Sequence, residues 1–199
     1  MKLHTLTLGS YGTNCYILWN EESSACLVID PGYEPERVLD TVAGLGLTVE
    51  AVLLTHGHFD HVGGVRQIAA DTDCRVFLNP ADTAMPPRLT AGPLYYTDTY
   101  TGGQQLTLAG LSFSVLSTPG HTPGSVCLLF DGDMFSGDTL FAGSCGRTDL
   151  PGGSYRQIKE SLKQLAQLSR DYRVHPGHGE STTLSAEKAS NPYLTGGLR

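Results

Sequence analysis

Short apolar runs separated by glycine, asparagine and serine fill the start of the chain, and strand-like spacing then alternates with helical spacing. The strand-like runs of the first half predict strands over 3–8, 15–19, 25–29, 49–54 and 75–78. The run 49–54 is apolar at nearly every position, which is typical of a strand buried on both faces. Helical spacing from Pro35 to Gly46 and again over Val65–Ala70 predicts two helices between these strands.

The second half shows the same mixture after a stretch of irregular spacing. Residues 79–104 carry four prolines, three glycines and no clear period, so we expect a functional loop over a site. Further strands are predicted over 105–108, 111–117, 126–130 and 172–174. Ser154–Ser169 has the clearest helical pattern, and Thr183–Ala189 predicts a shorter helix. Together these elements indicate an α+β fold in which helices cover sheets.

Composition and charge narrow the class of protein. A chain of 199 residues, 40% of them hydrophobic, can bury the core of a single domain over 1–199. The net charge of −7 lies entirely in the first hundred residues, whereas a phosphate-binding surface needs the opposite sign, so we expect no nucleic-acid partner. We expect no membrane association and a cytoplasmic location, because neither a signal-peptide core nor an 18-residue apolar run occurs. Five scattered cysteines without a CxxC pair fit a reducing compartment.

The candidate chemistry begins in the segment THGHFDH, which directly follows the predicted buried strand 49–54. A strand that runs into a glycine-containing loop can turn His56 and His58 toward one point, and Asp60 and His61 toward a neighbouring one. Imidazole and carboxylate groups are ligands that suit zinc, iron or manganese. The segment therefore predicts a metal site.

Three more candidate ligands each follow a glycine just past a predicted strand or short apolar segment. They are His121, Asp138 and His178. Side chains in such places converge over the edge of a sheet. With the first segment they make five histidines and two aspartates, about what two adjacent ions need when positions are left for water and substrate.

Other polar residues are interpreted without a role in ligation. His4 fits an edge strand, and His175 is taken as structural because Pro176 stiffens the chain beside it. Asp30 is either a turn former or a hydrogen-bond acceptor for a ligand histidine, and the sequence leaves both open. Cys145 has no evident paired base, which a nucleophilic cysteine would need.

The segment THGHFDH resembles the THxHxDH signature of the metallo-β-lactamase fold, and the three later candidates match that family's remaining ligands in order. FAGSCGRTDLPGGS and the closing segment are similar to its glyoxalase-II-like branch, which hydrolyses S-acyl-glutathione thioesters. The resemblance implies a four-layer αββα sandwich with metals at one edge of the two sheets. It further implies a first metal on His56, His58 and His121, a second on Asp60, His61 and His178, and Asp138 as a bridge.

The same resemblance implies a reaction. Two metal ions would share a hydroxide that attacks the carbonyl of a thioester, S-lactoylglutathione or a related compound. The expected metal is zinc, with iron or manganese as alternatives. Asp60 and Asp138 would be the catalytic carboxylates. The chain ends soon after Asn191-Pro192, so we expect it to lack the helical substrate domain of full-length hydroxyacylglutathione hydrolases. Arg147, Arg88 and Tyr95 are then candidates for binding the substrate.

Two other functions are weighed against this one. Persulfide dioxygenases share the fold, the signature and a GRTD segment like Gly146–Asp149, but use one iron on residues corresponding to His56, His121 and Asp138. A non-catalytic metal-binding protein is disfavoured, since a complete ligand set is hard to explain without metal chemistry. Antibiotic hydrolysis is also disfavoured, because Asp138 stands where many β-lactamases of this fold carry cysteine and no export signal is found.

Overall fold

The first half of the chain forms a six-stranded sheet in chain order in the computed structural model, which describes residues 1–195. Its strands are β1 (Lys2–Leu8), β2 (Thr13–Trp19), β3 (Ala25–Ile29), β4 (Thr48–Leu53), β5 (Arg75–Leu78) and β6 (Asp98–Thr99). The strands β1 to β3 are antiparallel neighbours, whereas β3 to β6 run parallel. Parallel neighbours need crossover connections, and the helices α1 (Pro35–Gly44) and α3 (Val65–Thr72) supply the first two.

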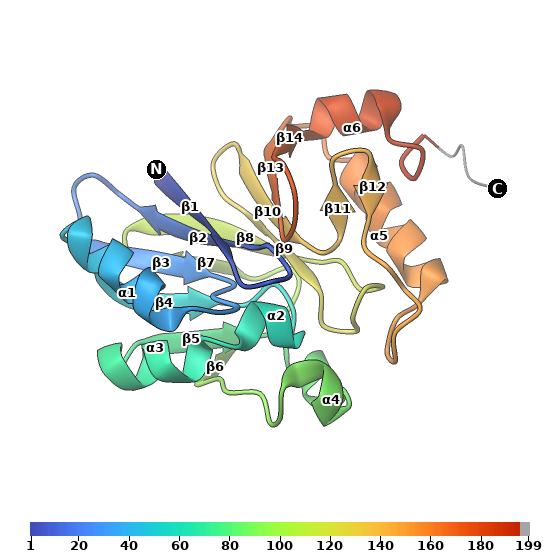
Figure 1. Cartoon of the computed structure of the whole chain (residues 1–199). Helices are drawn as coiled ribbons and strands as arrows, with labels where there is room; N and C mark the ends of the chain where they lie inside the picture. Colours follow the sequence, from blue (N-terminus) through green and yellow to red (C-terminus); the bar gives the residue numbers. More distant parts are fainter. Residues whose placement is uncertain (196–199) are drawn as a thin grey trace.

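A second six-stranded sheet, in the order β14-β13-β10-β9-β8-β7, faces the first (Figure 1). Its strands are β7 (Gln105–Leu108), β8 (Leu111–Ser117), β9 (Val126–Leu129), β10 (Asp133–Gly137), β13 (Arg173–Pro176) and β14 (Thr182–Thr183). The helix α5 (Tyr155–Ala166) connects the parallel strands β10 and β13, and α6 (Leu184–Ser190) follows β14. A small hairpin of β11 (Leu140–Phe141) and β12 (Ser144–Cys145) precedes α5.

Three buried apolar clusters separate four layers. In β2, Cys15 and Ile17 pack toward α1 and α3, while Tyr16 and Leu18 point to the second sheet. This alternation follows from the two-residue period of a strand. On the far side, α5 covers the second sheet through Leu162 and its neighbours. The predicted αββα sandwich is therefore confirmed.

The structure adds elements that the apolar spacing did not predict. They are α2 (Phe59–Val62), the 3₁₀ helix η1 (Pro80–Ala84), α4 (Pro87–Thr90), β6, β10, the β11–β12 hairpin and β14. None exceeds five residues, and the helices among them span too few turns to show a helical period. None of the helices within residues 1–195 has the length and hydropathy to cross a membrane.

Candidate metal centre

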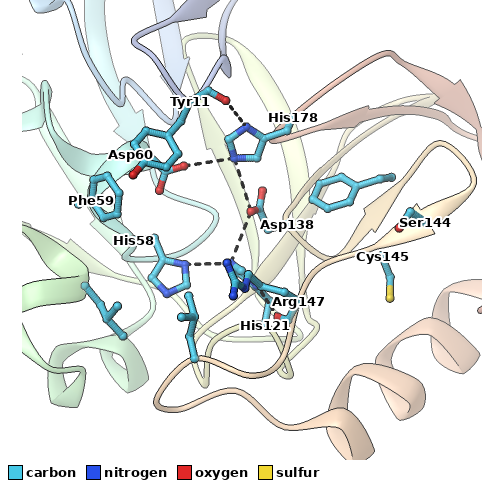
Figure 2. Close-up of a pocket in the computed structure, with 13 residues that line it drawn as sticks. Tyr11, His58, Phe59, Asp60, His121, Asp138, Ser144, Cys145, Arg147 and His178 are labelled. Atoms are coloured by element: carbon cyan, nitrogen blue, oxygen red, sulfur yellow. Dashed lines mark hydrogen bonds and ion pairs between the residues drawn. The ribbon is translucent and has the colours of Figure 1, made fainter.

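All seven candidate ligands meet at one end of the two facing sheets. They are His56, His58, Asp60, His61, His121, Asp138 and His178. His56 and His58 follow β4, Asp60 and His61 lie in the short helix α2, and the other three follow β8, β10 and β13. Figure 2 shows His58, Asp60, His121, Asp138 and His178 turned toward one cavity. The sequence segments that carry them are thus brought together as predicted, and two groups can be distinguished.

The first group joins His56, His58 and His121, whose ligand atoms all lie within 4.8 Å of one another. His58 Nδ1 is 2.8 Å from His121 Nε2. The opposite nitrogen of His121, Nδ1, donates to the backbone carbonyl of Arg147 at 2.8 Å. With its proton on Nδ1, His121 directs the lone pair of Nε2 at the other members of the first group. This is the tautomer that a metal ligand needs.

The second group joins Asp60, His61 and His178, again within 4.8 Å. His178 Nε2 lies 3.2 Å from Asp60 Oδ2. Asp138 stands between the groups, because its Oδ1 is 3.4 Å from His61 Nε2 and its Oδ2 is 3.5 Å from His121 Nε2. One carboxylate therefore faces both clusters.

Asp30 acts as a buried acceptor for a residue of the second group. Its Oδ2 accepts from His61 Nδ1 at 2.9 Å and from Thr55 Oγ1 at 2.6 Å, while Oδ1 accepts from the Thr55 amide. Asp30 also lies within 4.8 Å of His56 and His61 ligand atoms. Since both its oxygens are already engaged, the acceptor interpretation is the one that the geometry supports.

The loop that carries His178 is tied to the first sheet. The Asn14 side-chain amide donates to the carbonyls of Pro176 at 3.1 Å and Gly179 at 2.9 Å. The Tyr16 hydroxyl donates to the Pro176 carbonyl at 2.6 Å. These bonds fix the position of His178 although it comes from the second sheet.

The protonation of the site differs between the two groups. Burial, followed by the neighbouring imidazoles, holds the pKa of His56 well below its usual value and lowers that of His58 to about 4. Burial alone would also lower the pKa of His61, but Asp138 and Asp30 raise it to about 9. Burial opposes ionisation of Asp60, yet the hydrogen bond from His178 lowers its pKa. His56 and His58 are thus neutral imidazoles, the form that binds metals.

Four buried polar atoms of this centre lack a hydrogen-bond partner among residues 1–195. They are His56 Nε2, His58 Nε2, His61 Nε2 and Asp138 Oδ1. Buried polar atoms are nearly always paired, so such a concentration needs an explanation. Metal ions fit it, because the donor set is entirely imidazole nitrogen and carboxylate oxygen. The clusters suit a dinuclear centre of borderline or hard divalent metals.

A cavity of about 540 Å³ opens over the centre, and Arg147, a candidate for binding the substrate, lines it. Arg147 forms a bidentate pair with Asp149, at 2.8 and 2.7 Å, on the exposed rim. The other two predicted substrate residues do not line the cavity. Arg88 is exposed beside Leu89, which does line it, and Tyr95 packs on the core with Arg66 5.4 Å from its ring.

Sequence reasoning missed the apolar mouth of the cavity. Its walls include Tyr11, Phe59, Leu89, Phe141 and Leu150. Tyr11 is 61% exposed and meets the Phe59 ring edge-on at 5.1 Å. The signal in the sequence was a tyrosine within the glycine-containing segment 9–12, in the turn that joins β1 to β2.

His175 lies away from both ligand groups, as its structural interpretation requires. Its Nε2 is 2.8 Å from Asp133 Oδ1 and its Nδ1 is 3.1 Å from Ser181 Oγ. We expect His175→Ala to keep its metal and most of its turnover, and to lose about 1–3 kcal/mol of folding stability through the lost hydrogen bonds. His178→Ala should lose metal instead. Elemental analysis and urea unfolding of both variants check this, and matching behaviour of the two would contradict it.

Comparison with known sequences gives one family. Residues 8–178 match the profile of the metallo-beta-lactamase superfamily. The hydroxyacylglutathione hydrolase GloC of Haemophilus influenzae is 34% identical over 209 aligned positions, which cover 98% of each chain.

Solved structures agree in fold over nearly the whole chain. BLEG-1, described as a B3 metallo-beta-lactamase, has a TM-score of 0.88 and 35% identity, covering 98% of this chain and 100% of its own. TTHA1623, solved in a di-iron-bound form, has a TM-score of 0.83 and 39% identity over 96% of this chain and 100% of its own. ETHE1 from Myxococcus xanthus has a TM-score of 0.86 and 30% identity, covering 98% of this chain and 85% of its own.

Proposed function

This chain belongs to the metallo-beta-lactamase superfamily, and we propose that it is a two-metal hydrolase that cleaves a thioester, S-lactoylglutathione or a related S-acyl-glutathione. The observation that carries the proposal is the complete second group of Asp60, His61 and His178 beside the first. A single-ion enzyme would have little use for three further converging ligands. The similarity to GloC over the full length adds support for the substrate class.

The ligand residues divide the work at such a centre. His56, His58 and His121 would hold one ion and Asp60, His61 and His178 the other, with Asp138 shared between them. Bound divalent ions supply Lewis acidity, which lowers the pKa of a coordinated water and polarises the carbonyl under attack.

The surrounding residues orient and shield the reacting groups. The backbone carbonyls of Arg147 and Tyr11 fix the ring orientations of His121 and His178. The aromatic pair Tyr11–Phe59 covers one side of the cavity and reduces the access of bulk water. Under this proposal zinc is the resident metal, and TTHA1623 is the reason to test iron beside it.

A persulfide dioxygenase is the second candidate. The feature that favours it is the segment Gly146–Asp149, in which Arg147 lines the cavity and pairs with Asp149. That reaction consumes oxygen, whereas hydrolysis does not. Dependence on oxygen, together with the sulfur substrate consumed, therefore distinguishes the two candidates.

The deciding experiment uses the protein loaded with zinc and, separately, with iron, in the absence of oxygen. We expect S-lactoylglutathione to be hydrolysed under these conditions. No cleavage with either metal, together with oxygen-dependent sulfite formation from glutathione persulfide, would refute the hydrolase. A chromogenic β-lactam serves as a third substrate because BLEG-1 is described as a metallo-beta-lactamase.

Substrate binding by Arg147 gives a separate prediction. Both Arg147 and Asp149 are about two-thirds exposed, so a glutathione carboxylate can take the place of Asp149 on the guanidinium. We expect Arg147→Ala to raise KM roughly fivefold with little change in kcat, because it removes one exposed charge contact of about 1 kcal/mol. Arg156→Ala is the control, because Arg156 on α5 is another exposed arginine that pairs with a carboxylate. Unchanged KM in Arg147→Ala would contradict this role.

A further inference from the structure

A buried carboxylate outside the ligand set joins the two loops that carry the first group of histidines. Asp82 lies in the 3₁₀ helix η1 and has no exposed surface. Its Oδ2 accepts from the Gly57 amide at 2.8 Å and from Thr122 Oγ1 at 2.9 Å, and its Oδ1 accepts from the Gly124 amide at 2.6 Å. All three of these donors are uncharged.

The donors stand next to candidate ligands in the chain. Gly57 separates His56 from His58, and Thr122 directly follows His121. One carboxylate thus connects segments that come from different sheets. The three hydrogen bonds hold these segments in one arrangement, in which His58 Nδ1 and His121 Nε2 are 2.8 Å apart.

The packing around Asp82 requires glycine on one side of it. A Cβ atom at Gly124 would lie 2.7 Å from Asp82 Oδ1, closer than any side chain could tolerate. At Gly57 a Cβ would lie 3.2 Å from Asp82 Cβ. Burying a carboxylate is costly unless hydrogen bonds compensate for its lost hydration. An apolar residue here would fill space at lower cost but could not join the loops.

We propose that Asp82 is a positioning residue that sets the geometry, and hence the affinity, of the first metal site. The proposal rests on the metal centre of the proposed function. The second group is held by other partners, since Asp30 accepts from His61 and the Tyr11 carbonyl accepts from His178. Asp82 makes no described bond to that group, so its effect is confined to one of the two ions.

The test is zinc binding in competition with a chromophoric chelator, for the wild type and three variants. Asp82→Asn keeps the size of the side chain but turns one acceptor into a donor that faces a backbone amide. We expect it to lower the affinity for one zinc ion per chain about 10–100-fold and to leave the affinity for the other unchanged. Thr122→Val removes a single hydrogen bond to Asp82, and we expect a smaller loss at the same site.

Asp133→Asn is the matched control, because Asp133 is another buried carboxylate but pairs with Arg173 and His175 outside the centre. We expect it to lower the urea midpoint of the metal-free protein without weakening either zinc. If Asp82→Asn and Thr122→Val bind zinc as tightly as the wild type, or if both sites are weakened equally, the proposed role of Asp82 is wrong while the proposed function still stands. A wild-type chain that binds no zinc would overturn the proposed function as well.

Discussion

Replacement of Asp138 by alanine is expected to remove at least 99% of turnover and at least one bound metal ion per chain. Asp138 faces His61 at 3.4 Å and His121 at 3.5 Å, so its carboxylate lies against both ligand groups. Under the proposed function, its loss would leave each ion one donor short and would remove the negative charge between the two. Loss of a residue that only orients a metal ligand lowers metal affinity or activity about 10–100-fold, and loss of a ligand shared by both ions should lower them further.

The matched control is Asp131→Ala. Asp131 is also an aspartate of the second half, but its side chain is 92% exposed and pairs with Arg170 at the surface. We expect this control to retain full metal content and activity. Metal content by elemental analysis and initial rates on the thioester are the measurements. Full occupancy of both sites in Asp138→Ala would contradict its bridging role.

Gly177→Ala is expected to reduce turnover by about two orders of magnitude through a single added methyl group. A Cβ atom at Gly177 would lie 2.2 Å from Asp138 Oδ1 and 2.7 Å from His61 Cε1. Neither side chain can move away without leaving its place in the centre. A displacement of about 1 Å in a catalytic group can cost about 100-fold in rate.

Gly177→Ala should affect the free energy of unfolding less than it affects turnover. Overpacking costs about 1–3 kcal/mol, which urea unfolding of the metal-free protein will show. Gly44→Ala is the control, because a Cβ there meets no atom within 4 Å. Normal rates and metal content in Gly177→Ala would mean that the centre tolerates movement of Asp138, contrary to the arrangement described above.

The elements that the sequence predicts well are those whose signal is local. The run 49–54 was identified as a buried strand because its apolar character is continuous, and β4 ends within one residue of the predicted limit. The segment His56–His61 was predicted as a ligand cluster because its members are close in the chain. Candidates farther along, such as Asp138, were connected to it by analogous placement after strands, and the fold brings them together.

The features that the sequence could not predict depend on contacts between distant segments. Asp82 sits in a stretch without any period, and its function depends on amides 25 and 42 positions away. Tyr95 was a candidate for substrate binding because it lies in the stretch 79–104, which was predicted to be a functional loop over a site. In the structure Tyr95 packs against the apolar cluster between the first sheet and the helices α1 and α3, and Arg66 lies over its ring. Leu89 of the same stretch lines the cavity instead.

The link between Asn14 and Gly179 spans 165 positions of the chain, and it bears on how the protein is made. During synthesis His56, His58, Asp60 and His61 emerge long before His178. Neither ligand group is complete until most of the polypeptide has left the ribosome. Closing so long a loop has an entropic cost that only the assembled sheets repay. We therefore expect the proposed ions to bind late, after the hydrogen bonds of Asn14 have joined the early strands to the loop that carries His178.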